Sequence, residues 1–240
     1  MRRIAVRTAD FRLSFHLMRE LKRRGCDFVM LDIDSEFDGI WLATPEEVIA
    51  GEGGIPVIED TVEAAVERAI QLSRGLEDTT HLVFGVDPGP RPGLAWIADG
   101  VLVGVAQLES VESVANHIGG LANALEYRNL VVKIGDGAPL IRDRIINDCL
   151  LHSMHVIEVI ERRTSRGSRS RAHIHAATRI AMMGGKRVHS IRTLEPTEGD
   201  LREIKRQSRI ESGGRVTISS ELAHDVAVGS ISMVDAIKRA

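Results

Sequence analysis

Asp87 is the residue of this 240-residue chain best placed for metal chemistry. It follows the apolar run 82–86, which is short and rich in β-branched residues and so predicts a buried strand. The turn 88–93 holds three prolines, and proline lacks the amide donor that a continuing strand needs. A carboxylate fixed by a strand end beside such a turn can hold a metal ion and leave room for a phosphate. The alternative interpretation is that Asp87 only stabilises its turn.

A β-meander must position this aspartate. The apolar run 94–98 predicts a second strand, and Asp99 with Gly100 is a strong signal for a two-residue hairpin turn. Residues 101–108 then return as a third strand. The meander therefore fixes Asp87 at one end of its first strand.

The stretch GVDPGPRPGLAWIADG, residues 85–100, resembles the first motif of the RNase H-like superfamily, closest to its RuvC and YqgF branch. In that branch an aspartate ends the first strand and a glycine-led apolar strand follows. Helices and strands are then predicted to alternate, giving the order β-β-β-α-β-α-β-α that such a domain requires. The resemblance covers residues 81–185. An actin-like ATPase shares the aspartate at a strand end, but it needs a second phosphate loop and a duplicated domain.

The resemblance implies a metal site for phosphodiester hydrolysis. Asp87 would supply the first acid, Asp136 the second at the end of the next apolar strand, and His173 a ligand from the last helix. The branch places another acid three residues later on the same helix face, where this chain has Ala176. A Gly-Asp-Gly turn and a solvated histidine are the alternatives for Asp136 and His173.

Two carboxylates and one imidazole do not determine which metal ion the site would bind. Mg²⁺ and Mn²⁺ both accept oxygen ligands, and the imidazole also suits Zn²⁺. A single ion, or a site that has lost catalysis, are further alternatives. The expected cofactor is a divalent metal, Mg²⁺ or Mn²⁺.

A basic stretch precedes and follows His173. Residues 162–192 carry nine lysines and arginines and no acid. The arginines of its first loop stand beside hydroxyl residues and a glycine, a composition that suits phosphate contacts. These predicted nucleic-acid contacts are Arg163, Arg166, Arg169 and Arg171. The alternative is a solvated basic loop.

Residues 1–76 predict a small parallel α/β domain, because strand and helix patterns alternate there. The pattern predicts a helix over 11–24 that buries Phe11, Phe15, Met18 and Leu21 on one face. The domain would resemble receivers or flavodoxins in fold. It carries neither a G-x-G-x-x-G nor a P-loop sequence, so no phosphate site is expected in it.

The remaining segment predicts short helices with polar starts and a small apolar face. We therefore expect an α/β protein with a small parallel domain over 1–76, an RNase H-like mixed-sheet domain over 81–192 and a helical extension over 195–240. The extension would dock on the core or on a second subunit, which makes a homodimer possible.

Composition bounds the function. The chain is 43% hydrophobic, has a net charge of −3, and contains no apolar run as long as the ~18 residues of a membrane span. Cys26 and Cys149 lack zinc-site or disulfide-framework spacing, so a cytoplasmic protein is expected, with no membrane partner. The expected function is metal-dependent hydrolysis of structured nucleic acid. The alternative is a nucleic-acid-binding protein with a degenerate site.

Overall fold

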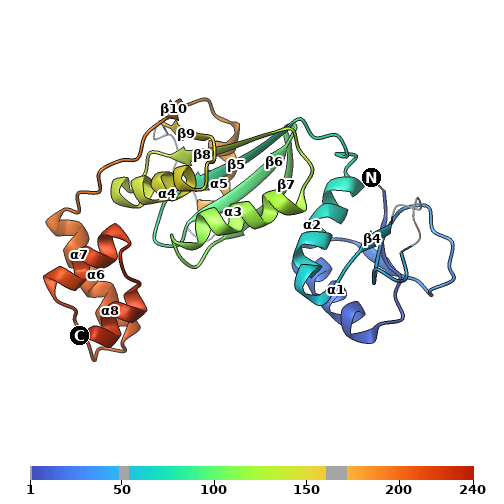
Figure 1. Ribbon diagram of the computed structural model, residues 1–240, viewed down its shortest axis with the longest axis horizontal. Helices are drawn as coiled ribbons and strands as arrows, with labels where there is room; N and C mark the ends of the chain where they lie inside the picture. The colour runs from blue at the N-terminus through green and yellow to red at the C-terminus, as the bar shows by residue number, and fades with distance from the viewer. Residues whose placement is uncertain (1, 49–53, 161–171) are drawn as a thin grey trace. The chain divides into compact units, whose positions relative to one another are not determined.

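The computed structural model describes residues 2–48, 54–160 and 172–240, with the backbone alone for 172–174. It contains two β-sheets and eight α-helices in the described part of the chain, the last three of them after both sheets (Figure 1). The predicted class is confirmed: a small parallel sheet, a larger mixed sheet and a helical C-terminal segment.

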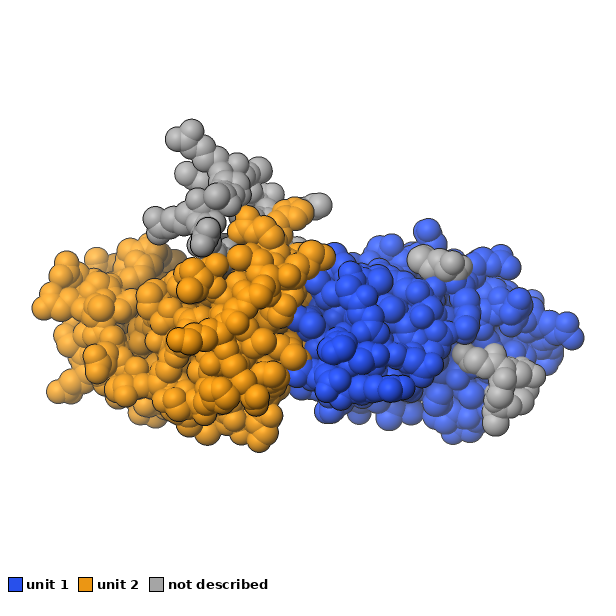
Figure 2. Space-filling model, turned by 90° about the horizontal axis from the view of Figure 1, so that it is seen from above, with its two compact units in different colours: residues 1–83, 96–104, 116–130 blue, residues 84–95, 105–115, 131–240 orange. Residues whose placement is uncertain are grey.

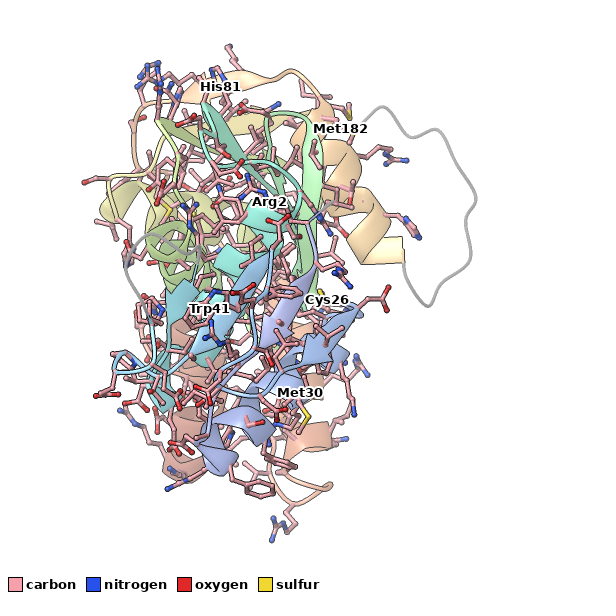
Figure 3. The ribbon with its side chains drawn as sticks, turned by 90° about the vertical axis from the view of Figure 1, so that its right-hand side faces the viewer. Arg2, Cys26, Met30, Trp41, His81 and Met182 are labelled. Atoms are coloured by element: carbon pink, nitrogen blue, oxygen red, sulfur yellow. The ribbon has the colours of Figure 1, made fainter. Side chains whose placement is uncertain are left out.

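The first sheet is parallel throughout and has the strand order β2-β1-β3-β4. Its strands are β1 Ile4–Val6, β2 Phe28–Met30, β3 Ile40–Ala43 and β4 Gly54–Pro56. Trp41, labelled in Figure 3, is 1% exposed and packs with Ala5 and Ala43 on one face of this sheet. Helices α1 (Phe11–Arg23) and α2 (Val62–Ser73) contact each other and the central strands β1 and β3. A short 3-10 turn, η1 (Glu59–Thr61), directly precedes α2.

The predicted buried face of α1 is wrong at Phe11 and Phe15 and is confirmed at Leu21. Phe11 is 84% exposed and Phe15 is 52% exposed, whereas Leu13, Leu17 and Leu21 are buried. The helix carries two apolar stripes at four-residue spacing, and the larger side chains lie on the outward one. Because both stripes have the same period, the sequence pattern alone did not separate them.

The second sheet has the order β10-β9-β8-β5-β6-β7. Its elements follow one another as predicted, β-β-β-α-β-α-β-α, with one additional strand, β10 (Lys186–Val188), antiparallel to β9. The predicted elements are β5 His81–Asp87, β6 Gly93–Ala98, β7 Val101–Gln107, α3 Ser113–Ala124, β8 Asn129–Gly135, α4 Pro139–Leu151, β9 Val156–Val159 and α5 Ala172–Met182. Strand β6 is buried along its whole length, so this sheet forms the main core.

The chain divides into two compact units (Figure 2). One comprises Met1–Val83, Trp96–Gly104 and Asn116–Leu130, and the other comprises Phe84–Ala95, Val105–Ala115 and Val131–Ala240. The division passes through β5, β6 and β7 rather than between residues 76 and 81, where the sequence placed a domain boundary. The domain boundaries drawn from the sequence stay predictions.

Three helices close the chain: α6 (Glu198–Glu211), α7 (Ser220–Val228) and α8 (Met233–Arg239). They share a small core built on Ile218, Ala223, Val226 and Ala236. A hydroxyl residue caps each helix, and its side chain accepts an amide hydrogen bond from the first turn; these N-caps are Thr197, Ser219 and Ser232. Local capping therefore fixes where each helix of the bundle starts.

Candidate functional site

Strand β5 holds Asp87 at its last position. The residues before it, Phe84 to Val86, are buried, and Asp87 itself is half-buried. Pro88 and Gly89 are buried as well, so the turn after the strand packs against the protein. Asp87 therefore extends from a rigid strand end, as the sequence predicted.

Strand β8 lies beside β5, and Asp136 follows its last residue, Gly135. A Cβ placed on Gly137 would lie 3.9 Å from the carbonyl oxygen of Pro88, so the turns that follow the two strands are in contact. Asp87 therefore ends one strand, and Asp136 directly follows the neighbouring strand of the sheet. Asp136 is half-buried, like Asp87.

Helix α5 packs directly on β5 at Gly85. A Cβ on Gly85 would lie 2.6 Å from the Ala181 nitrogen and 2.7 Å from the Ala181 Cβ, and it would also meet the carbonyl oxygen of Ala177. Only glycine permits this backbone contact. Asp87 lies two residues after Gly85 and so on the same face of the strand, the face that α5 covers.

Lys133 binds the C-terminal end of α5. Its Nζ on β8 donates to the carbonyl oxygens of Ala181 at 2.8 Å and Met183 at 2.7 Å. A cation suits a helix C-terminus, where carbonyl groups lack partners within the helix. Burial lowers the pKa of Lys133. The sequence prediction did not include this contact, although a lysine in an otherwise apolar strand was its signal.

The third predicted ligand position, on α5, has fewer described donor atoms. The backbone of His173 belongs to the first turn of α5, and its side chain lies outside the described residues, as do Arg163, Arg166, Arg169 and Arg171. Ala176 is half-buried and offers no donor atom. Among the residues that the structure describes, no group of three or more His, Cys, Asp or Glu side chains could hold a metal.

Helix α4 starts three residues after Asp136, and its N-cap has an unusual backbone conformation. Ala138 at its N-cap has φ 39° and ψ 73°, in the left-handed region, and Pro139 occupies the first turn. An alanine in this region is strained by about 1–2 kcal/mol. Such strain tends to persist where the surrounding structure demands it, as beside functional sites. The amide end of α4 is also attractive to anions.

Arg192, a member of the basic stretch, is engaged in an ion-pair network with acids of α4 and β9. Arg192 lies 2.5 Å from Asp143 Oδ1 and 2.7 Å from Glu158 Oε2, and Arg142 pairs with both acids. Burial raises the pKa of Asp143, but the hydrogen bonds from Arg142 and Arg192 outweigh it and lower the pKa. Arg179, Lys186 and Arg187 of the same stretch are exposed.

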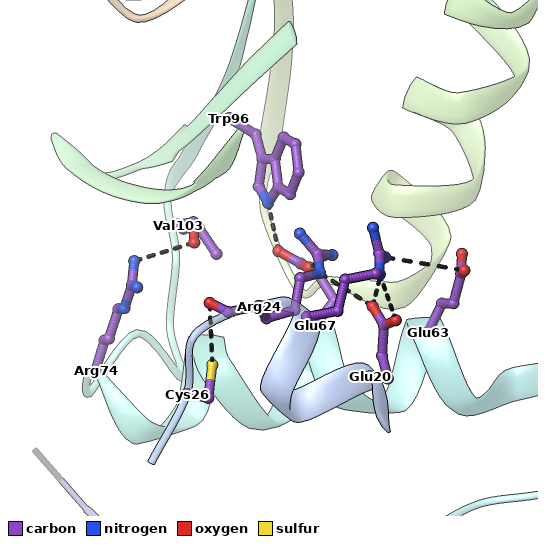
Figure 4. Close-up of polar contacts among 9 residues, drawn as sticks. Glu20, Arg24, Cys26, Glu63, Glu67, Arg74, Trp96 and Val103 are labelled. Carbon is purple, nitrogen blue, oxygen red and sulfur yellow. Dashed lines mark hydrogen bonds and ion pairs between the residues drawn. The ribbon is translucent and has the colours of Figure 1, made fainter. Parts of the chain in front are cut away.

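A second carboxylate cluster lies in the first compact unit (Figure 4). Glu67 on α2 is 0% exposed, pairs with Arg24 at the C-cap of α1 and accepts a hydrogen bond from the Trp96 indole of β6. Arg24 also bonds Glu20 at 3.1 Å. Burial raises the pKa of Glu67, against the opposing effects of Arg24 and Trp96. This enclosed acid was also absent from the sequence prediction.

Comparison with known proteins reaches only the C-terminal bundle. The family model of a three helical bundle domain matches residues 197–240, which are α6 to α8 with their flanking residues. Searches of curated proteins and of solved structures found no match to this chain.

Proposed function

We propose that residues 81–185 form a domain of the RNase H-like superfamily, of the RuvC and YqgF branch, that hydrolyses phosphodiesters of structured nucleic acid. The observation that carries the proposal is the pair of acids, Asp87 and Asp136, at the ends of neighbouring strands with contacting turns. The confirmed element order and the packing of α5 on β5 support it further.

The donor set fits a divalent cation in part. Asp87 and Asp136 provide the hard oxygen atoms that Mg²⁺ and Mn²⁺ prefer, and His173 would add a nitrogen. When bound, the metal would supply Lewis-acid stabilisation of the phosphate charge. The chain's own contribution is to place Asp87 at the end of β5 and Asp136 directly after β8, and to hold α5 against β5 through Gly85. Ala176 leaves the set one ligand short for a second ion.

A second candidate function is nucleic-acid binding without turnover. Ala176 favours it, because it supplies no ligand at the position where the branch places another acid. The basic residues Arg179, Lys186 and Arg187 are exposed and would serve either function. Arg163, Arg166, Arg169 and Arg171 complete the proposed nucleic-acid contacts.

The test is a cleavage assay on branched and single-stranded DNA and RNA with Mg²⁺ or Mn²⁺. Asp87→Asn should abolish metal-dependent cleavage. Asp99→Asn is the matched control, because Asp99 lies at the other end of the same meander and accepts amide hydrogen bonds from Thr80 and His81 at 2.8 Å. Cleavage that survives Asp87→Asn would refute the assignment. Binding without cleavage would favour the second function.

We also propose a cytoplasmic location. Cys26 and Cys149 are free thiols, as a reducing compartment would keep them, and burial raises the pKa of Cys149 to about 12. Of the described helices, none is long and apolar enough to cross a membrane. A homodimer stays a prediction, to be measured by sedimentation.

A further inference from the structure

Helix α1 presents a stripe of large apolar side chains to solvent. Phe11 is 84% exposed and Phe15 is 52% exposed, and Met18 is half-buried one turn further along the same face. The chain contains five phenylalanines, so this one stripe displays two of them. Single exposed apolar residues are ordinary, whereas neighbouring large ones mark a surface that contacts a partner.

The stripe has the spacing of a coiled-coil seam. Phe11, Phe15, Met18 and Lys22 follow one another at intervals of four, three and four residues. This alternation keeps one row of side chains facing a partner helix, here over about 16 Å of helix length. The leucines that α1 buries within its own unit lie on another side of the helix. The stripe is therefore a separate contact face, and its spacing fits a second helix.

The unmatched charges at the two ends of the stripe have opposite signs. Glu59 lies 2.6 Å from Arg12, so these two neutralise each other and place η1, with Asp60, beside the first turn of α1. Arg19 and Lys22 are exposed at the other end. Among the described residues, no ion pair engages Asp60, Arg19 or Lys22. The stripe is thus acidic at its start and basic at its end.

An antiparallel copy of the same helix complements this stripe. With a two-fold axis between Phe15 and Met18, Phe15 packs on Met18 of the partner subunit, and Phe11 meets Lys22 of the partner subunit. An ammonium group over a phenyl ring is a favourable contact, and from there it can also reach the carboxylate of Asp60. A parallel copy would instead place like charges side by side. A polyanion fits less well, because Asp60 would repel its phosphates.

We propose that α1 joins two copies of this chain as an antiparallel helix pair across a two-fold axis. The exposed fractions of Phe11 and Phe15 leave roughly 200–340 Å² of phenyl surface per copy for the partner. With its polar rim, such an interface belongs to the small class below about 1,200 Å² in total, so the dimer should be weak. The proposal uses no residue of the strand-end site and holds whether or not the chain cleaves nucleic acid.

The experiment is sedimentation velocity of the full chain from about 1 to about 200 µM, the range that brackets a micromolar dissociation constant. The parent chain should pass from monomer to dimer within this range. Phe11→Ala with Phe15→Ala should raise the dissociation constant at least about 30-fold, because aromatic anchors at the centre of an interface dominate its affinity. Circular dichroism checks that each variant is folded.

The matched control removes exposed apolar surface from other elements. Leu151 at the end of α4 is 69% exposed, and Ile210 on α6 is 62% exposed. Leu151→Ala with Ile210→Ala should leave the dissociation constant of the parent chain unchanged. This control separates a contact through α1 from general association of apolar surfaces.

A charge exchange tests the antiparallel arrangement. Lys22→Glu and Asp60→Lys should each raise the dissociation constant about 5- to 10-fold, because each places like charges across the interface. The chain that carries both changes should return to within about threefold of the parent, because the two-fold axis then restores both attractive pairs. In a parallel pair residue 22 faces its own copy, and the double variant would not recover.

Several results would overturn the proposal. They are a parent chain that is monomeric at every concentration, a dimer that survives loss of both phenylalanines, and two charge variants that do not rescue each other. A monomer that sediments more slowly without the phenylalanines would show that the chain's own segment covers the stripe. Loss of single-stranded oligonucleotide binding, with no change in oligomeric state, would assign the stripe to nucleic acid. Asp87→Asn should dimerise like the parent, so failed cleavage and failed dimerisation are distinguishable.

Discussion

The acids of Figure 4 and the acids at the strand ends have opposite surroundings. Glu67 is wholly enclosed, and a guanidinium and an indole N–H saturate its oxygen atoms. Asp87 at the end of β5 and Asp136 directly after β8 are half-buried, so part of each side chain is exposed to solvent. An enclosed and matched acid stabilises a fold, whereas an acid that solvent reaches at a strand end can exchange its partners. Burial and position, more than residue type, separate a structural carboxylate from a candidate ligand.

Removing the enclosed acid should have the largest effect on stability. Glu67→Ala leaves the Arg24 guanidinium with Glu20 as its remaining acidic partner in a largely buried place. Breaking such a pair lowers the free energy of unfolding by about 3–5 kcal/mol, and we expect about 3 because Glu20 remains. Urea denaturation measures the loss.

The controls for this loss come from both regions. Glu63→Ala, at an exposed acid on the same helix, should change the free energy of unfolding by less than about 0.5 kcal/mol. Asp87→Asn should change it by less than about 1 kcal/mol while removing cleavage. Equal destabilisation by Glu67→Ala and Asp87→Asn would erase the distinction between the two regions.

Completing the ligand set should raise cleavage. Ala176→Asp adds a carboxylate three residues after His173, on the same face of α5. If the site lacks one ligand, metal-dependent cleavage should rise by roughly tenfold or more, because the added oxygen strengthens the second ion. Steady-state cleavage rates measure the gain. Ala176→Asn, of the same size and uncharged, should give a smaller gain, and an equal gain would argue against a metal.

The pH dependence of stability should report the enclosed acid. Because burial raises the pKa of Glu67, its folded state holds a proton more tightly than its unfolded state. The stabilising contribution is then fully present below the ordinary value of 4.5 and is lost as pH rises through the folded pKa. The stability advantage of the native chain over Glu67→Gln should shrink between acid and neutral pH. An advantage that grows with pH would contradict this sign.

The smallest expected effect concerns the turn after Asp136. Ala138→Gly relieves the left-handed strain but adds freedom to the unfolded chain, so the net gain should be about 0.5 kcal/mol. Thermal unfolding measures it. A matched Ala176→Gly change within helix α5 should instead destabilise by roughly 1 kcal/mol. A loss at Ala138 would show that the turn is not strained.

Local signals in the sequence predicted much of the fold. Asp99 and Gly100 both adopt positive φ, as the hairpin signal required. Thr197 caps its helix as its residue type favours. These features depend on a few neighbouring residues, which is why a single sequence can predict them.

Features that depend on distant partners were missed. Strand β10 consists of Lys186, Arg187 and Val188, and its pairing with β9 rather than its composition makes it a strand. The Arg192 network joins residues far apart in the chain. The outward stripe of α1 was chosen for burial because nothing local tells which stripe faces a sheet. For the candidate site, the two strand-end acids were predictable, and the partner of the last helix was not.

Gly85 sets the distance between β5 and α5 at the candidate site. Because α5 rests on the backbone of β5 there, the separation between the Asp87 strand and the helix that carries His173 is set by one hydrogen atom. A methyl group at this position would push α5 away from β5, because its carbon would lie within 2.7 Å of Ala181. The distance between β5 and α5, the two elements that carry Asp87 and His173, thus depends on the glycine two residues before Asp87.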